Sequence, residues 1–178
     1  DATEERKDIA ESNPLPEPVR GEIEFREVHF EYTEDKPALH AISLTAKPGQ
    51  MTALVGPTGA GKSTLVNLLP AFYEATGGAI TIDGQGIAAT SLESLRKNIS
   101  VVSQEPFLFN GTVGENIAYG NLDASAEQLT EAAQAANCFE FISELADRFD
   151  TKVGERGVRL SVGEKQRISI ARALLKNS

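Results

Sequence analysis

A glycine-rich stretch of nine residues, GPTGAGKST at positions 56–64, sets the strongest limits on the fold of this chain. Gly56, Gly59 and Gly61 allow the backbone to turn tightly and to point its N–H groups inward, where a side chain would intrude. The apolar run at 51–55 suits a buried strand, and residues 63–69 suit the start of a helix. A strand, a glycine-rich loop and a helix in this order are typical of a phosphate-binding loop.

The loop also carries the charged and hydroxyl groups that a nucleoside triphosphate requires. Lys62 offers a positive charge to the β- and γ-phosphates, and the Ser63 hydroxyl is a ligand for Mg²⁺. We therefore expect a bound triphosphate with Mg²⁺. The expected contacts are Gly56, Pro57, Thr58, Gly59, Ala60, Gly61, Lys62, Ser63 and Thr64.

Charge balance and cysteine content exclude several kinds of partner and site. The 17 Lys and Arg residues face 26 Asp and Glu residues, a net charge of −9, whereas broad contact with nucleic acid needs a basic surface. Cys138 is the only cysteine, so an intrachain disulfide and a zinc site of several cysteines are excluded. The apolar Phe139 beside it favours an inert, buried thiol. With no apolar run long enough for a bilayer and no secretory signal, we expect a soluble, cytoplasmic domain.

The remaining segments predict a linker and several strands. Residues 1–20 are charged and then proline-rich, which indicates an extended, weakly packed linker from something upstream. Residues 22–30 alternate polar and apolar side chains, the pattern of a strand with one buried face. Residues 41–46 and 79–82 also suit strands, and we expect antiparallel β structure beside the nucleotide core. A further short strand is predicted at 99–103.

Capping-box spacing predicts where two helices begin in the middle of the chain. Thr90 and Glu93 have this spacing, and so do Ser125 and Gln128. The second of these helices is expected to run toward Leu145.

Three further motifs resemble those of the nucleotide-binding domains of ABC transporters, specifically bacterial exporters that join a membrane domain to an ATPase domain. Residues 102–106, VSQEP, resemble the Q-loop, and residues 107–117 continue it in the exporter style. Residues 151–157, TKVGERG, resemble the X-loop, and residues 160–164, LSVGE, resemble the ABC signature. The resemblance runs from Glu22 to the last residue.

This resemblance implies an α/β fold: a P-loop NTPase core with an antiparallel β subdomain and a helical subdomain that bears the signature. Residues 1–20 would then be a linker from a preceding membrane domain, and residues 21–178 the nucleotide-binding domain. The family's domain binds ATP with Mg²⁺ at the cytoplasmic face of the cell membrane, and hydrolysis drives export. The implied partners are a second nucleotide-binding domain and the transmembrane domain of the same transporter, with no nucleic acid.

The resemblance also implies roles for single residues. Tyr32 falls where the family places an aromatic ring that stacks on adenine. Gln104 would approach Mg²⁺ and the attacking water, so Lys62 and Gln104 would serve catalysis while Ser63 and Gln104 serve the metal. In a head-to-tail dimer, the γ-phosphate held by the second subunit would be faced by Ser161, Gly163 and Glu164.

Two signature positions depart from the family's commonest residues. Val162 stands where glycine is commonest, and Glu164 stands where glutamine is commonest. The valine adds bulk and the carboxylate adds negative charge near a phosphate, which weakens contact unless a helix cap holds the acid back. Ser161 and Glu164 have the spacing of such a cap. Replacements of both kinds occur within the family that the chain resembles, so we interpret them as tuning.

After the signature helix, the family continues with a Walker B strand that ends in Asp-Glu, a D-loop and a switch histidine. This sequence stops at Ser178, before these motifs. The aspartate orients Mg²⁺ and the glutamate polarises water, so these 178 residues alone are expected to bind nucleotide weakly and hydrolyse it poorly. We interpret the sequence as a fragment of a longer protein, whose missing strand would normally cover the strand before the phosphate loop.

Two other functions stay open. A non-hydrolysing half of a heterodimeric transporter would hold ATP without turnover, and the residue after the Walker B aspartate would decide this. A soluble ABC ATPase of DNA repair or translation is disfavoured by the acidic charge, the exporter-style X-loop and the proline-rich linker.

Overall fold

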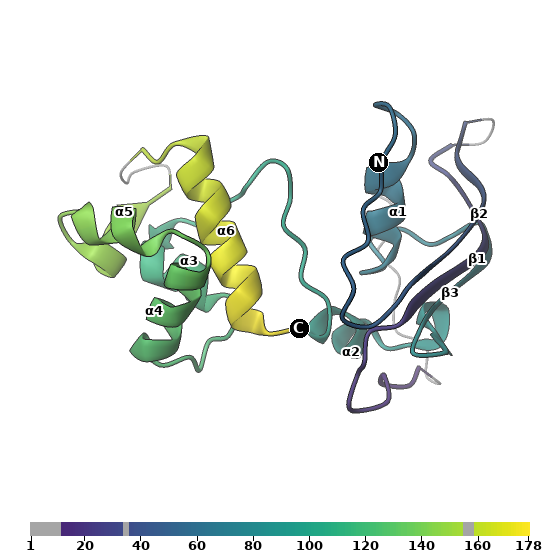
Figure 1. Cartoon of the computed structure of the whole chain (residues 1–178), viewed down its shortest axis with the longest axis horizontal. Coiled ribbons are helices and arrows are strands. Elements are labelled where there is room, and N and C mark those ends of the chain that lie inside the picture. Colours follow the sequence, from purple (N-terminus) through teal and green to yellow (C-terminus); the bar gives the residue numbers. More distant parts are fainter. Residues whose placement is uncertain (1–11, 34–35, 155–158) are drawn as a thin grey trace. The chain divides into compact units, whose positions relative to one another are not determined.

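The computed structural model of the chain describes residues 12–33, 36–154 and 159–178. The chain forms two units, Asp1–Ile99 and Ser100–Ser178. Each unit has a hydrophobic core of its own. The first unit is built on a β-sheet and the second is mainly helical (Figure 1).

A four-stranded antiparallel sheet, in the order β2-β1-β3-β4, forms the base of the first unit. Its strands are β1 (Ile23–Glu31), β2 (Pro37–Ala46), β3 (Gly77–Ile82) and β4 (Gln85–Gly86). The central strand β1 pairs with both β2 and β3, since Ile23 lies opposite Ala46 on one side and Ile82 on the other. The three strands predicted from the sequence and their antiparallel arrangement are therefore confirmed.

The alternation in β1 is interrupted by a bulge at Glu27. Strict alternation after Phe25 would turn residue 27 inward, but Glu27 has a φ of 46° and the pairing register shifts between Phe25 and Val28. Phe25, Val28 and Phe30 are consequently all buried, at 5% exposure or less. One extra residue in the strand thus keeps the apolar face on the core.

Three short helical elements complete the first unit: α1 (Lys62–Leu68), the 3-10 helix η1 (Ile87–Ala89) and α2 (Leu92–Lys97). The predicted start of α2 at Thr90 is wrong by one residue, because Ser91 is the N-cap and its hydroxyl accepts the N–H of Ser94 at 3.3 Å. The Thr90 hydroxyl is fully buried and donates to the carbonyl oxygen of Gly86 at 3.0 Å. Its oxygen accepts a hydrogen bond from Gln85 Nε2 at 3.0 Å, so both bonds join Thr90 to the β4 region rather than to the start of the helix.

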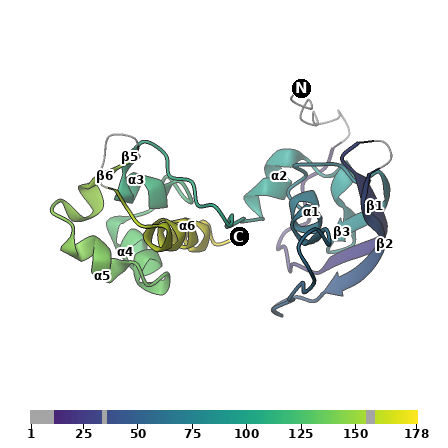
Figure 2. The same cartoon turned by 90° about the horizontal axis from the view of Figure 1, so that it is seen from above.

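The second unit consists of helices joined by a two-stranded sheet (Figure 2). Its elements are β5 (Gly111–Thr112), α3 (Val113–Ala118), α4 (Ala126–Ala135), α5 (Phe139–Glu144), η2 (Arg148–Asp150), β6 (Lys152–Val153) and α6 (Val162–Lys176). Helix α6 packs along α3 and α4 and buries Ile168 and Ala171 in the core. The capping box at Ser125 is confirmed.

The helix predicted to run from Ser125 toward Leu145 is two helices. Helix α4 ends at Ala135, and Asn137 has a φ of 53°, the left-handed conformation that stops a helix and that asparagine tolerates well. Cys138 then starts α5 and is fully buried. The prediction of a buried cysteine is therefore confirmed, and burial raises the pKa of its thiol to about 11, against the lowering effect of Arg167.

Two predicted strands are irregular instead. Residues 51–55 carry no strand, and Met51 and Val55 are 99% and 93% exposed. Residues 99–103 are also without a strand, with Val101 and Val102 partly exposed. A strand depends on hydrogen bonds to a neighbour, and neither segment pairs with another strand within the described parts of the chain. The apolar patterns of these two segments were therefore insufficient to predict strands.

The described end of the predicted linker is packed, not loose. Leu15 is only 2% exposed, and its N–H donates to the Ser94 hydroxyl at 2.9 Å. Asp83 accepts the N–H groups of Arg20, Gly21 and Glu22 at 2.6, 3.2 and 2.9 Å. Burial alone would raise the pKa of Asp83, but these three donors outweigh it and lower the pKa. The expectation of weak packing is therefore wrong for residues 12–20 of the predicted linker, whereas residues 1–11 lie outside the described part.

Candidate nucleotide site

The glycine-rich loop leads directly into α1, and two of its glycines have conformations that other residues avoid. Gly59 and Gly61 have φ values of 85° and 81°, while Gly56 is not in the left-handed region. A Cβ on Gly61 would lie 2.6 Å from the Ala38 carbonyl oxygen, but one on Gly59 would meet nothing within 4 Å. Gly61 thus allows α1 to approach β2, and Gly59 borders the open space where a ligand can enter.

Lys62, the first residue of α1, folds back over the loop. Its Nζ donates to the carbonyl oxygens of Gly56 at 2.9 Å and of Pro57 at 2.8 Å. An ammonium group has three N–H donors, so these two bonds leave capacity for a further acceptor. The side chain therefore braces the loop and holds its positive charge there.

The start of α1 presents backbone donors to the same region. The first hydrogen bond within the helix is from the Leu65 N–H to the Gly61 carbonyl oxygen, at 2.9 Å. The N–H groups of Lys62, Ser63 and Thr64 precede it, and no side chain caps this helix within the described residues. These donors suit an anion. The exposed Ser63 hydroxyl adds a hard oxygen ligand of the kind that Mg²⁺ takes beside phosphate oxygens.

Tyr32, just beyond the end of β1, lies beside this loop. Its hydroxyl is 2.9 Å from the Thr64 Oγ1, and the residue as a whole is 54% exposed. Its ring centroid lies 4.8 Å from that of Phe30 and 5.3 Å from that of Tyr73, at nearly perpendicular angles. Sequence reasoning missed Tyr73 and the contact of Thr64 with Tyr32. The aromatic pair Phe72-Tyr73 after α1 was the available signal.

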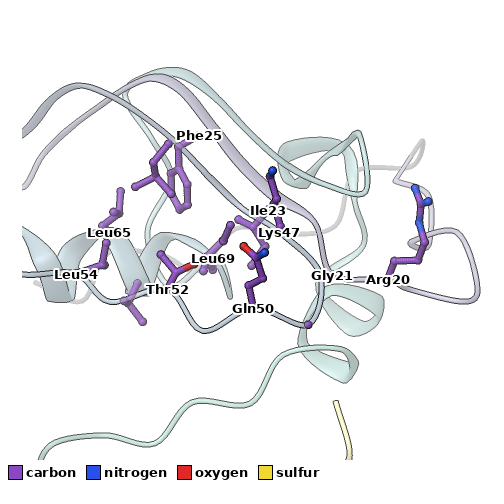
Figure 3. Close-up of a pocket in the computed structure, with 14 residues that line it drawn as sticks. Arg20, Gly21, Ile23, Phe25, Lys47, Gln50, Thr52, Leu54, Leu65 and Leu69 are labelled. Carbon is purple, nitrogen blue, oxygen red and sulfur yellow. The ribbon is translucent and has the colours of Figure 1, made fainter.

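An apolar pocket of about 430 Å³ also lies in the first unit, but it is not the phosphate site (Figure 3). Phe25, Leu44 and Leu65 line one part of it, and Thr52 and Leu54 of the irregular segment line another. None of residues 56–64 is among its lining residues. Arg20 and Lys47 also line this pocket, but the predicted phosphate loop does not, so we keep the open surface at the loop as the candidate nucleotide site.

The residues of the predicted signature lie at the start of α6 in the second unit. The Ser161 hydroxyl accepts the Glu164 N–H at 3.3 Å, and Glu164 Oε2 accepts the Ser161 N–H at 2.6 Å. The predicted capping box is therefore formed. The bonds to the Ser161 backbone and hydroxyl lower the pKa of Glu164. Val162 is 71% exposed, and Gly163 is exposed beside it.

Gln104 belongs to the same unit as the signature helix, in an exposed, irregular segment. The Gln166 side chain of α6 donates to the Ser103 carbonyl oxygen at 3.3 Å, so α6 contacts the residue next to Gln104. The predicted X-loop starts at the buried Thr151 and includes β6, but its residues 155–157 lie outside the described part. The functions of both loops stay predictions.

Comparison with known proteins now decides the family. A family model described as "ABC transporter" matches residues 39–178. The chain belongs to the ABC transporter family. The structure of a bacterial Atm1-family ABC exporter with ATP bound has a TM-score of 0.93 and 44% identity, covering 99% of this chain and 31% of that one. The predicted α/β fold of an ABC ATPase is confirmed.

Curated ABC transporters are similar along nearly the whole chain. An ATP-dependent lipid A-core flippase of Legionella pneumophila (strain Paris) is 53% identical over 164 residues, which are 92% of this chain and 28% of the flippase. The mitochondrial iron-sulfur clusters transporter atm1 of Neurospora crassa is 50% identical over 171 residues, 96% of this chain and 24% of that transporter. The chain therefore corresponds to the ATP-binding domain of ABC exporters and spans less than a third of these relatives. None of its described helices has the length and apolar character needed to cross a membrane.

Proposed function

We propose that this domain binds and hydrolyses ATP as the motor of an ABC exporter, and that ATP-dependent pairing of two such domains drives export. The observation that carries the proposal is the braced phosphate loop, in which Lys62 holds the carbonyl oxygens of Gly56 and Pro57 while the first N–H groups of α1 remain available. These groups bind phosphate as fixed positive charges and dipoles.

Three parts of the chain have distinct roles in this proposal: the phosphate loop with the start of α1, Tyr32 and, in the second unit, Gln104. Lys62 and the loop N–H groups bind the β- and γ-phosphates, and the exposed ring of Tyr32 stacks on the base. The Ser63 hydroxyl would hold Mg²⁺, which supplies further positive charge to the phosphates when it is bound. Gln104 is proposed to approach the metal and the attacking water.

The second unit is proposed to act on the ATP of a partner domain. The N-terminus of α6 exposes Ser161 and Gly163, and its free backbone donors suit a phosphate. Because Glu164 is bonded to the Ser161 N–H, its carboxylate is committed to the cap, which supports the idea that the acid is held back from the phosphate.

The remaining assignments also belong to the proposal. Residues 1–20 are a linker from a membrane domain, and residues 21–178 are the nucleotide-binding domain. The partners are a second such domain and the transmembrane domain, and the domain works at the cytoplasmic face of the membrane. The named relatives, a flippase and a transporter, support this placement.

Titration of the intact protein with ATP tests the proposed function. We expect saturable binding of MgATP that inorganic tripolyphosphate displaces, because both ligands use the phosphate loop. A lack of ATP binding by the folded protein would contradict the proposal.

Replacing Glu164 by glutamine tests the cap. Glutamine also completes a capping box, so Glu164→Gln in the intact protein should leave ATP hydrolysis unchanged or raise it. The lowered pKa of Glu164 means that its charge stabilises the fold above its ordinary pKa, and that this contribution is lost as the pH falls through the lowered value. The variant should therefore melt slightly lower than wild type at pH 7 and equally at low pH. A steep loss of hydrolysis would show that the acid has a positive catalytic role.

A further inference from the structure

The ring of Tyr32 is held from three directions. Its hydroxyl shares a hydrogen bond of 2.9 Å with Thr64 Oγ1, and its ring lies nearly perpendicular to Phe30 and to Tyr73, at centroid distances of 4.8 and 5.3 Å. Two of these neighbours are fixed in the core, since Phe30 is 5% exposed and Thr64 is 7% exposed. Tyr73 also contacts Phe30, at a centroid distance of 5.5 Å.

Tyr32 has these contacts although more than half of its surface is exposed to solvent. The residue is 54% exposed, and a tyrosine with so much exposed surface would exchange rotamers freely unless its neighbours held it. A ring that is already in place avoids the entropy cost of ordering it when a ligand stacks on it. The geometry therefore describes an aromatic platform that is built before any base arrives.

The hydrogen bond also joins this platform to the phosphate loop. Thr64 lies in the first turn of α1, next to Ser63 and Lys62, and its backbone N–H is one of the donors that precede the first helical bond. The Tyr32 hydroxyl is thus attached to the turn that would receive the phosphates. This bond, between residues 32 positions apart in the sequence, is a direct link between the base platform and the phosphate loop.

We propose that Thr64, through its side-chain hydroxyl, and Tyr73 are positioning residues that hold Tyr32 in place, and that they thereby give the site its preference for a nucleotide over a base-free polyphosphate. The inference rests on the proposed function, because it assumes that Tyr32 receives the base. It assigns no catalytic step to either residue.

The test compares two ligands of the intact protein, ATP and inorganic tripolyphosphate, each with Mg²⁺. Tripolyphosphate fills the phosphate loop but has no nucleoside, so the ratio of its Kd to that of ATP measures the contribution of the nucleoside, and a change in this ratio between variants that leave the ribose contacts intact reports on the base platform. One hydrogen bond is worth about 0.5–1.5 kcal/mol, which corresponds to a loss of roughly 2- to 12-fold in this ratio. We expect this loss for Tyr32→Phe and for Thr64→Val. Because both variants remove the same hydrogen bond, the double variant should show the same loss as either single variant, not the product of the two.

Further variants distinguish the loss of a contact that positions Tyr32 from a general loss of structure. Thr64→Ser keeps the hydroxyl and should have the wild-type ratio of Kd values. Tyr73→Phe keeps the ring that contacts Tyr32 and should also have the wild-type ratio, whereas Tyr73→Leu removes the ring and should lower the ratio. Tyr119→Phe is the matched control, because Tyr119 is another exposed tyrosine, 55% exposed, that belongs to the second unit. It should leave the ratio unchanged. Thermal unfolding of each variant checks that the fold is retained.

Three results would overturn the inference. One is an unchanged ratio in Tyr32→Phe while wild type binds ATP. A second is an additive loss in the double variant, which would mean that the two hydroxyls act separately. A third is tighter ATP binding by Tyr32→Phe, which would make the hydrogen bond a latch that opposes the ligand. If wild type binds neither ligand, the proposed function fails as well, so the two failures are distinguishable.

Discussion

Replacing Lys62 by alanine should reduce ATP hydrolysis by the intact protein by about 100- to 1000-fold, the usual cost of removing one group that stabilises charge in a transition state. Two effects combine. The phosphates lose a positive charge, and the loop loses the bonds from Nζ to the carbonyl oxygens of Gly56 and Pro57. Phosphate release under saturating ATP measures the change.

Two further variants test whether the charge of Lys62, rather than its aliphatic stem or any exposed lysine, is needed for ATP hydrolysis. Lys62→Met keeps the aliphatic stem without the charge and should be as inactive as Lys62→Ala. Lys47→Ala is the matched control, since Lys47 is an exposed lysine of the same unit outside the loop, and it should behave as wild type. Hydrolysis at the wild-type rate by Lys62→Ala would defeat the assignment of this lysine.

Replacing Gly61 by alanine should destabilise the first unit by roughly 2–5 kcal/mol, the sum of a left-handed φ and an overpacked contact. Gly61 has a φ of 81°, and a Cβ there would lie 2.6 Å from the Ala38 carbonyl oxygen and 2.7 Å from Leu39 Cδ2. The backbone of β2 would have to move away from α1. We expect a lower melting temperature and weaker ATP binding, measured on the intact protein.

Gly84→Ala is the matched control for this prediction. Gly84 has a φ of 82°, almost that of Gly61, but its Cβ would meet nothing within 4 Å. It should therefore cost only about 1–2 kcal/mol, from the backbone conformation alone. Equal losses of stability in the two variants would show that the contact with β2 does not matter.

Local patterns predicted those elements whose cause is local. The alternation in residues 22–30 gave β1, although the bulge at Glu27 was hidden because one extra residue changes the register without a distinct composition. The capping boxes at Ser125 and Ser161 were predicted correctly, since both partners lie three residues apart. The prediction of a helix start at Thr90 was wrong because the Thr90 hydroxyl accepts from Gln85 Nε2 and donates to the Gly86 carbonyl oxygen, while Ser91 caps the helix.

Elements that depend on distant partners were beyond a single sequence. The run at 51–55 has the composition of a buried strand but no described partner, so it is exposed. Leu15 is buried in the core of the first unit, and its N–H donates to Ser94, so its position depends on residues far away in the sequence. In the site, the glycines and Lys62 were evident from the motif, but the attachment of Tyr32 to Thr64 and its contact with Tyr73 depend on how β1 and α1 pack.

Phosphate release from ATP by the intact protein, with and without Mg²⁺, tests the central claim most directly. The account predicts saturable release in the presence of Mg²⁺ that stops when EDTA removes the metal and returns when the metal is restored. Tight binding of ATP without any release in Mg²⁺ would contradict a motor domain and would instead fit a nucleotide-binding half that does not hydrolyse ATP.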